Sequence, residues 1–436
     1  MNWRFRILTA DARNRKGRYA AALELLEPEP PSNVPTEIFW RRTLTQASAL
    51  CQWGKYAQAE ERFSQAAALH AEPGAWNYMR GRCAMAQQEW KTAENYLRLV
   101  TAQSSNPDPF LRAYALGTLS WLAIRDLRYE EAIDLANECL SIVRALHASP
   151  LEEVALGNLG ELYTVLGAFN AGLQNSEAAE RIAAQWKLLR DQQKWLINIG
   201  IDQATRGQSG MAEQSYNRAL TIATQLGDKD IAAKCLRQLT ALKLGQHQLD
   251  VAEKYHSQES NLGLQQDNLK YWQLDEAAIL AAHGDYAEAA LELRELLQKV
   301  EIEDAQRSVF HYKLIWIIQS RMAFSYAAQG NPIEAEKWFQ RSIATIDNAA
   351  KGMKHEEFRT AVRDNIPVYD GYVAFLIAQH QPEKALQVAQ LGRARTLLLD
   401  EAKPTAKAPV AEDAKGWLSK IQHYLGRNKS VLLSYF

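Results

Sequence analysis

Cysteine and histidine are the residues of this sequence whose chemistry could be most reactive, as nucleophiles, general bases or metal ligands. The four cysteines, Cys51, Cys83, Cys139 and Cys235, are widely separated, and each lies among apolar or alanine-rich residues. None forms a CxxC motif, so we expect buried free thiols in a reducing compartment. The nine histidines show no HxxxH or HExxH spacing, so the sequence supports no zinc site.

A cysteine–histidine pair is the nucleophilic arrangement that remains to be weighed, formed by Cys235 with His247 or His256. A single helical hairpin offers neither an oxyanion hole nor a deep cleft, which argues against such a pair. We therefore predict no catalytic residue, no metal and no cofactor, and we do not expect an enzyme within these 436 residues.

The overall composition excludes several classes of protein. With 47% hydrophobic and 23% charged residues, the chain is apolar enough to fold. Its net charge of −1 offers no basic surface for nucleic acid or for an anionic membrane. No run of about 18 apolar residues could span a bilayer. The expected location is the cytoplasm, unless an N-terminal signal or anchor has been removed.

An internal repeat determines the fold class. The phrase Gly-x-aromatic-x-x-Ala begins at Gly17, Gly54 and Gly284, and looser copies fill the gaps. Ten small anchor residues, all alanine but one, mark the copies: Ala22, Ala59, Ala93, Ala132, Gly172, Ala212, Ala252, Ala289, Ala335 and Ala385. Their steps run from 34 to 50 residues, and three successive steps are of 40. A fixed period in this range is typical of a solenoid.

Each repeat is expected to be a hairpin of two amphipathic helices. Glycine ends the first helix because it tolerates positive φ, and the aromatic residue two positions later fills the gap between the helices. No hairpin alone can bury its apolar stripe, so neighbouring repeats must stack. The sequence thus predicts an all-α fold.

The pattern resembles the tetratricopeptide-repeat (TPR) family over residues 1–400. This resemblance implies a right-handed α-solenoid of about ten TPR-like helical hairpins. Steps near 40 exceed the family's usual 34 and are similar to its longer-helix variants. The longer steps after Ala289 imply longer helices or a changed stacking angle, and Pro367 is expected to start or kink a helix.

In the TPR family the first helix of each hairpin lines a concave groove. The position fourteen residues before each anchor, which often contacts a bound peptide in that family, is polar in the middle of the array. It is occupied by Asn158, Asn198 and Gln238. Each amide can donate to and accept from the backbone of an extended peptide. The resemblance therefore implies a peptide-binding groove with a ladder of three amides.

Two lysines extend this expected site. Lys194 and Lys234 precede Asn198 and Gln238 by four residues, one helical turn away on the same face. They partly resemble the family's carboxylate clamp, but Val154 replaces the first expected lysine. The alternative is that all of these side chains are solvated on an unused face.

The C-terminal tail carries a second resemblance. Residues 368–376 and 383–398, the latter with an Arg-Ala-Arg-Thr-Leu-Leu motif, look like the junction in TPR proteins with a C-terminal CHAT domain, which has a caspase-like protease fold. Residues 401–415 have the composition of a linker, and residues 416–436 are expected to begin a truncated CHAT-like domain with a short helix and a strand. The alternative is that residues 431–436 close the last helix groove. No catalytic residue of that family maps onto this sequence.

These observations favour a protein-binding or peptide-binding TPR scaffold as the function. Its partners would be a protein or peptide in the groove and a CHAT-like protease domain in cis, for which the array would be the sensing or regulatory half. The alternatives are a stand-alone TPR adaptor or scaffold, and a TPR signalling regulator of transcription or phosphotransfer. The absence of a basic patch argues against direct DNA contact.

Overall fold

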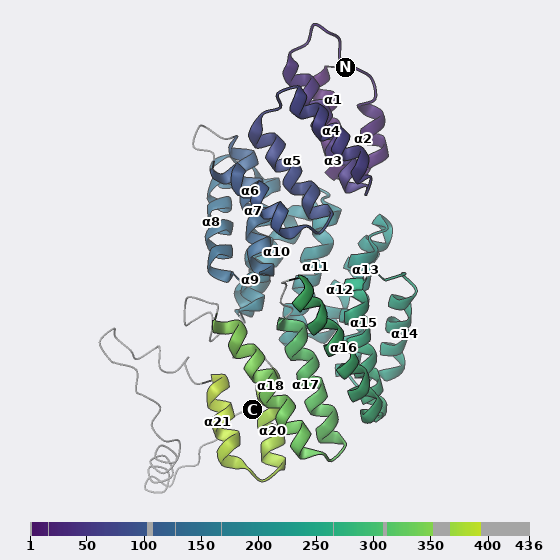
Figure 1. Cartoon of the computed structure of the whole chain (residues 1–436), viewed down its shortest axis with the longest axis vertical. Coiled ribbons are helices and arrows are strands. Elements are labelled where there is room, and N and C mark those ends of the chain that lie inside the picture. The colour runs from purple at the N-terminus through teal and green to yellow at the C-terminus, as the bar shows by residue number, and fades with distance from the viewer. Residues whose placement is uncertain are drawn as a thin grey trace, which may run out of the picture. The chain divides into compact units, whose positions relative to one another are not determined.

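In the computed structural model, the described residues form ten successive pairs of helices (Figure 1). The structure describes residues 2–15, 17–102, 108–126, 128–166, 168–264, 266–307, 312–351 and 367–393. No strand occurs among these residues. The expected linker over residues 401–415 and the expected CHAT-like segment over residues 416–436 lie outside the described residues.

The first helices of the pairs carry the positions at which a groove was expected. They are α1 (Trp3–Arg15), α3 (Thr36–Gln52), α5 (Pro73–Ala86), α7 (Pro109–Arg125), α9 (Ser149–Val165), α11 (Leu189–Thr205), α13 (Lys229–Gly245), α15 (Gln266–His283), α17 (Tyr312–Ala328) and α20 (Pro367–Ala378). Helix α20 begins at Pro367, as the fixed φ of proline in the first turn favours.

The second helices carry the ten anchor residues. They are α2 (Tyr19–Leu25), α4 (Tyr56–Ala68), α6 (Trp90–Ala102), α8 (Tyr129–Ala145), α10 (Phe169–Gln185), α12 (Ser209–Leu226), α14 (Leu249–Ser260), α16 (Tyr286–Arg307), α18 (Pro332–Lys351) and α21 (Pro382–Arg393). The long steps after Ala289 correspond to long helices, since α16 has 22 residues and α18 has 20.

All ten anchors lie in the first turns of these second helices and are buried. Nine are alanines that are at most 3% exposed, and Gly172 is also buried. The large residue four positions later is buried as well at Phe63 and Tyr216, each 1% exposed. A small residue at the anchor lets the two helices approach closely. The buried positions of the ten anchors confirm the all-α repeat that their spacing predicted.

The turns between helices require backbone conformations with positive φ. Gly17, Gly54 and Gly284 take φ values of 71°, 79° and 94°, as the repeat pattern predicted. At other helix ends histidine adopts positive φ, at His70, His147, His247 and His380. Histidine is one of the few residues besides glycine that enters this region with some frequency. Four of the nine histidines therefore have a structural position at helix ends.

The expectation of four free thiols was wrong for two of the cysteines. Cys51 on α3 and Cys83 on α5 form a disulfide, with their Cα atoms 5.3 Å apart, whereas Cys139 and Cys235 are free and buried. The two bonded residues are 32 positions apart in sequence, but α3 and α5 are the first helices of successive repeats and pack against each other. Stacking of the repeats thus brings together thiols that the sequence separates.

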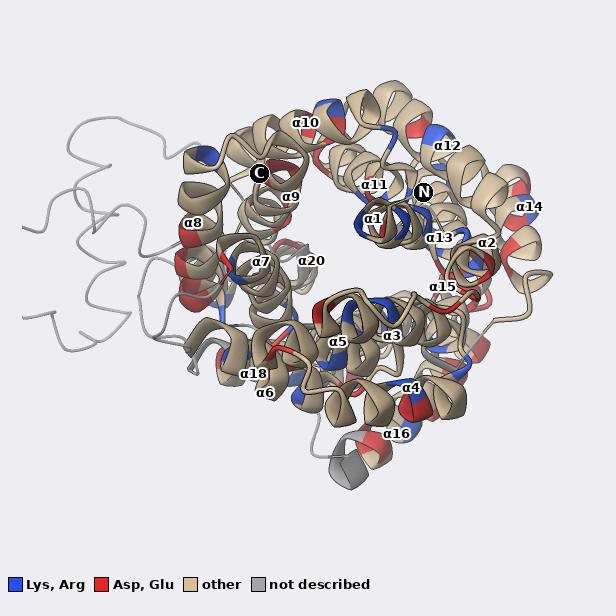
Figure 2. Cartoon of the chain, turned by 90° about the horizontal axis from the view of Figure 1, so that it is seen from above, with Lys and Arg blue, Asp and Glu red and all other residues tan. Residues whose placement is uncertain are grey.

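The chain divides into two compact units, Met1–Asn268 and Leu269–Phe436. In the first unit the odd-numbered helices α3 to α13 form an inner row and contact one another in succession, and the even-numbered helices cover their outer side (Figure 2). We call the side of α7, α9, α11 and α13 that is turned away from the even-numbered helices the inner face. Within the described residues, no helix is both long and apolar enough to cross a membrane.

Candidate functional site

The register of α9 turns Asn158 away from α10, and the register of α11 turns Asn198 away from α12. On α9, a Cβ at Gly160 would lie 2.4 Å from the Ser176 hydroxyl of α10, and on α11 a Cβ at Gly200 would lie 2.4 Å from the Tyr216 ring of α12. These glycines therefore face the outer helices. Asn158 and Asn198 precede them by two residues, which is a rotation of about 200° around a helix. The two amides thus lie on the opposite side.

Asn158 is committed to a contact between repeats. Its side chain is buried, and Nδ2 donates a 2.7 Å hydrogen bond to the carbonyl oxygen of Gly117 on α7. Gly117 lies in the middle of α7, so its carbonyl oxygen also accepts the helical hydrogen bond, and Asn158 uses its second lone pair. Asn158 therefore joins two successive inner helices.

Asn198 and Gln238 differ from Asn158 in this respect. Asn198 is 7% exposed and Gln238 is half-buried, yet neither side chain forms a hydrogen bond with another residue that the structure describes. Neither amide is among the buried side-chain polar groups that lack a partner in the described residues, so the polar atoms of both are open to solvent. These two amides thus retain donors and acceptors that a ligand on the inner face could satisfy.

Lys194 lies one turn before Asn198 and is surrounded by carboxylates. Its ammonium group is 3.4 Å from Asp191 Oδ1. Desolvation acts against the charge, but Asp191, Glu153 and Asp228 together outweigh it and raise the pKa of Lys194. Since 52% of the side chain is exposed, solvent screens these interactions and limits their strength. Lys194 therefore presents a cation that is already partly neutralised.

Lys234 occupies the equivalent position on α13 and has a different environment. Its side chain is half-buried and forms no ion pair with a carboxylate of the described residues. A half-buried ammonium group without a counter-ion attracts an anion more strongly than one that is already paired. Of the two predicted lysines, Lys234 is thus the one with unused charge.

Glu153 and Trp195 belong to the same region, and the sequence interpretation missed them. The indole Nε1 of Trp195 donates a 2.5 Å hydrogen bond to Glu153 Oε2 between α11 and α9. Burial and the nearby Asp191 raise the pKa of Glu153 well above its usual value, against the opposing effects of Trp195 and Lys194. The sequence gives little sign of this role, because Glu153 stands beside a second acidic residue, Glu152, near the start of α9.

The start of α13 is tied to α11 by a second polar contact. Gln193 Nε2 donates a 2.8 Å hydrogen bond to Asp228 Oδ2. Asp228 also caps α13, because its Oδ1 accepts a hydrogen bond of 3.3 Å from the backbone N–H of Ile231. This contact fixes α13, and hence Lys234 and Gln238, relative to α11.

The cysteine–histidine pair considered from the sequence has no reactive thiol. Cys235 is 0% exposed, and burial raises its pKa to about 12 despite the nearby Lys234. A nucleophilic cysteine requires the thiolate, which this environment disfavours. Among the described residues, no group of three or more histidine, cysteine or acidic side chains could hold a metal ion.

Comparisons with known proteins identify the fold. No family model matches the sequence, and comparison with curated proteins gives no significant match. Among solved structures, a Rap protein complexed with competence and sporulation factor superposes with a TM-score of 0.61 at 13% identity, over 84% of this chain and 100% of that one.

Two structures of NprR show the same likeness. NprR in complex with its cognate peptide NprX has a TM-score of 0.55 at 14% identity, over 79% of this chain and 97% of that one. The apo form of the quorum sensor NprR from B. thuringiensis has a TM-score of 0.57 at 15% identity, over 78% and 96%. At such identities the likeness establishes the fold alone: the chain is a TPR-type helical-repeat solenoid.

Proposed function

We propose that the protein is a peptide-binding regulatory scaffold whose ligand lies on the inner face of α9, α11 and α13. The amides of Asn158, Asn198 and Gln238 and the ammonium groups of Lys194 and Lys234 would form the site. The observation that carries this proposal is the Asn198 amide, which has no hydrogen-bond partner among the described residues and keeps its polar atoms open to solvent on a side chain that is 7% exposed.

The five residues have different roles in this proposal. Asn198 and Gln238 bind the backbone of an extended peptide, and Lys234 binds an acidic group. Asn158 positions α9 through the Gly117 carbonyl, and Lys194 is held by Asp191. Two amide hydrogen bonds of about 1 kcal/mol each orient a peptide more than they bind it, so apolar contacts supply most of the affinity.

The solved complex of NprR with its cognate peptide supports a peptide as the ligand class, because it shows that a solenoid of this fold can hold one. The regulatory role is part of the same proposal. Control of a CHAT-type protease in cis stays a prediction from the sequence, and it is tested by reading the gene beyond Phe436 for a protease-like domain with histidine and cysteine.

A library of displayed random peptides, selected on the full chain, tests the site. Selected peptides should lose at least about tenfold in affinity for the double variant Asn198→Ala/Gln238→Ala, which removes two hydrogen bonds of about 1 kcal/mol. The variant Gln185→Ala, which changes an exposed amide at the end of the outer helix α10, should bind as the wild type does. Equal affinity for the double variant would refute the site.

A further inference from the structure

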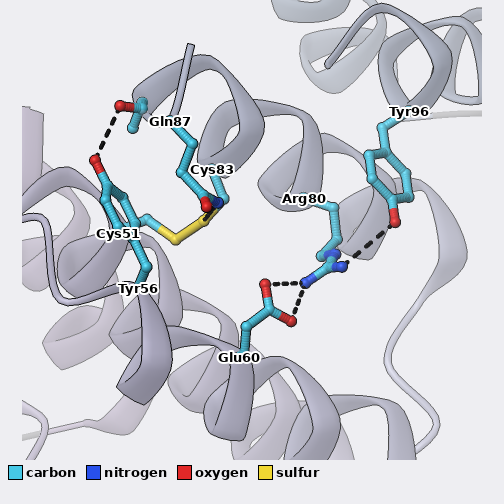
Figure 3. Close-up of a disulfide and its surroundings, with 8 residues drawn as sticks. Cys51, Tyr56, Glu60, Arg80, Cys83, Gln87 and Tyr96 are labelled. Atoms are coloured by element: carbon cyan, nitrogen blue, oxygen red, sulfur yellow. Dashed lines mark hydrogen bonds and ion pairs between the residues drawn. A yellow bond between two sulfur atoms is a disulfide. The ribbon is translucent and has the colours of Figure 1, made fainter. Parts of the chain in front are cut away.

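The disulfide between Cys51 and Cys83 lies inside the core rather than on the surface. Cys51 is 1% exposed and Cys83 is 3% exposed, and both belong to a cluster with Leu50, Phe63 and other apolar residues. Figure 3 shows the bond between the two inner helices, with the side chain of Gln87 beside it; Gln87 Nε2 lies 3.5 Å from the Cys83 sulfur. The bond thus joins the second repeat to the third.

Other contacts join the same two repeats without the disulfide. The hydroxyl of Tyr56 donates a 3.0 Å hydrogen bond to the carbonyl oxygen of Ala86, and Arg80 forms an ion pair with Glu60 (Figure 3). The Arg80 guanidinium also lies 5.0 Å from the centre of the Phe63 ring on α4. The interface between the repeats therefore has polar and aromatic contacts of its own.

Comparison of the repeats shows that this position does not require a covalent bond. Cys51 lies eight residues before its anchor Ala59, and Cys83 lies ten residues before Ala93. In later repeats, the residue eight positions before one anchor is matched with the residue ten positions before the next anchor. These pairs are Met85 and Leu122, Ile124 and Leu162, Thr164 and Asp202, and Ala204 and Leu242. Three of these four pairs are apolar.

The apolar pairs show what the fold needs at this register. Leu122 is buried and Met85 packs against its cluster, and Ala204 and Leu242 pack against another shared cluster. Two reduced cysteines behave as small apolar side chains and would suit the same position. The structure therefore accommodates both the disulfide and the dithiol.

We propose that Cys51–Cys83 is a redox-controlled covalent link between the second and third repeats. When the Cys51–Cys83 bond forms, a small disulfide such as oxidised glutathione accepts two electrons. Cys51 and Cys83 lose their thiol protons to the two released glutathione thiolates, and one S–S bond forms as another breaks. Reduction by two glutathione molecules, through a mixed disulfide, reverses the reaction.

The two remaining cysteines do not take part. Burial raises the pKa of Cys139 and of Cys235 to about 12, and the two lie in separate clusters of the core. Their thiols stay protonated and enclosed, which protects them from exchange. Exchange at Cys51 and Cys83 requires α3 to separate locally from α5, because both sulfurs are buried. The reaction is thus confined to one interface.

The test equilibrates the full chain in glutathione buffers of increasing oxidised fraction. Free thiols are then alkylated under denaturing conditions and counted by mass spectrometry, while circular dichroism follows the helices. We expect conversion between four and two free thiols with an unchanged helical signal. Hydrogen exchange of amides in α3 and α5 should be several-fold faster in the reduced chain, and exchange in α11 and α13 should not change.

Two variants serve as controls. Cys139→Ala/Cys235→Ala should keep the response, and Cys51→Ala should abolish it; if Cys51→Ala fails to fold, reduced wild type provides the unlinked state. Three results would overturn the proposal: four free thiols in every buffer, loss of helical signal on reduction, or equal exchange of α3 and α5 in both states. Peptide binding is not measured in this test, so its outcome is independent of the proposed function.

Discussion

The hydroxyl oxygen of Thr164 on α9 lies 2.7 Å from Oδ1 of Asp202 on α11 and 2.9 Å from the carbonyl oxygen of Gly160. The hydroxyl has a single proton and can donate to only one of these acceptors. When the hydroxyl donates to Asp202 it stabilises the carboxylate, and it then cannot donate to Gly160. Thr164 therefore links α9 to Asp202, a side chain that is 0% exposed.

Asp202 should make stability depend on pH. Burial, opposed by Thr164 and Arg206, raises the pKa of Asp202 from 3.8 to about 6. The folded chain then binds this proton more tightly than the unfolded chain does. The contribution of Asp202 to the free energy of unfolding is largest below its unfolded pKa and declines by about 2–3 kcal/mol as pH rises through its folded pKa.

The variant Asp202→Asn, which cannot titrate, should lack this decline. Urea unfolding at about pH 4 and about pH 8 gives the free energy of unfolding of the variant and of the wild type. The difference between the two proteins should change from one pH to the other. Asp134→Asn, which changes an exposed carboxylate on α8, should follow the wild type. A difference between Asp202→Asn and wild type that does not vary with pH would contradict the prediction.

Gly172 should not tolerate a side chain. A Cβ at this position would lie 2.6 Å from the Thr164 hydroxyl and 3.2 Å from Asp202 Oδ2, which explains why this anchor alone is glycine. We expect Gly172→Ala to lower the free energy of unfolding by about 1–3 kcal/mol through overpacking. Gly210→Ala, in the first turn of α12 with no atom within 4 Å of its Cβ, should be neutral or stabilise by up to about 1 kcal/mol. Thermal unfolding of both variants distinguishes crowding from a general effect of alanine.

Asn158 and Asn198 should respond differently to the same substitution. Asn158→Ala removes the donor to the Gly117 carbonyl and should destabilise the chain by about 1–3 kcal/mol. Asn198→Ala should leave stability within about 0.5 kcal/mol and weaken peptide binding roughly fivefold. Denaturation and titration with one selected peptide are both needed. Equal losses of stability would show that Asn198 is a structural residue.

Lys234 should matter more than Lys194 for acidic peptides. Lys234→Met removes a cation that has no described counter-ion, so binding should weaken and become less sensitive to salt. Lys194→Met removes a cation that Asp191 already neutralises in part, so its effect should be smaller. Fluorescence titration of an acidic library peptide at low and high salt compares the two. A larger effect at Lys194 would reverse the assigned roles.

The fold was predictable because small anchors repeat at a period that only stacked hairpins satisfy. All ten anchors were found where the spacing placed them, and Gly17, Gly54 and Gly284 adopt the expected positive φ. The disulfide was missed because the cysteines were compared by sequence separation rather than by position within their repeats. Counting from Ala59 and Ala93 would have placed them at positions that meet between successive repeats.

The candidate site was predictable only in part. Register alone assigns Asn158, Asn198 and Gln238 to one row, but it does not reveal that Asn158 reaches a carbonyl on the preceding helix. Pairing of Lys194 with Asp191, and of Trp195 with Glu153, depends on side-chain packing across two helices. The identity of a residue gives its hydrogen-bonding capacity, whereas the fold determines how much of it is already used.

The three successive steps of 40 residues, from Ala132 to Ala252, make the middle of the array an interchangeable module. Helices α7, α9, α11 and α13 each contain 17 residues, so successive inner helices in this region have equal lengths. In a solenoid each repeat contacts mainly its neighbours. Tandem duplication of one block, such as residues 172–211, would therefore lengthen the inner face by one repeat, add a second copy of Asn198 and extend the proposed site for a longer peptide.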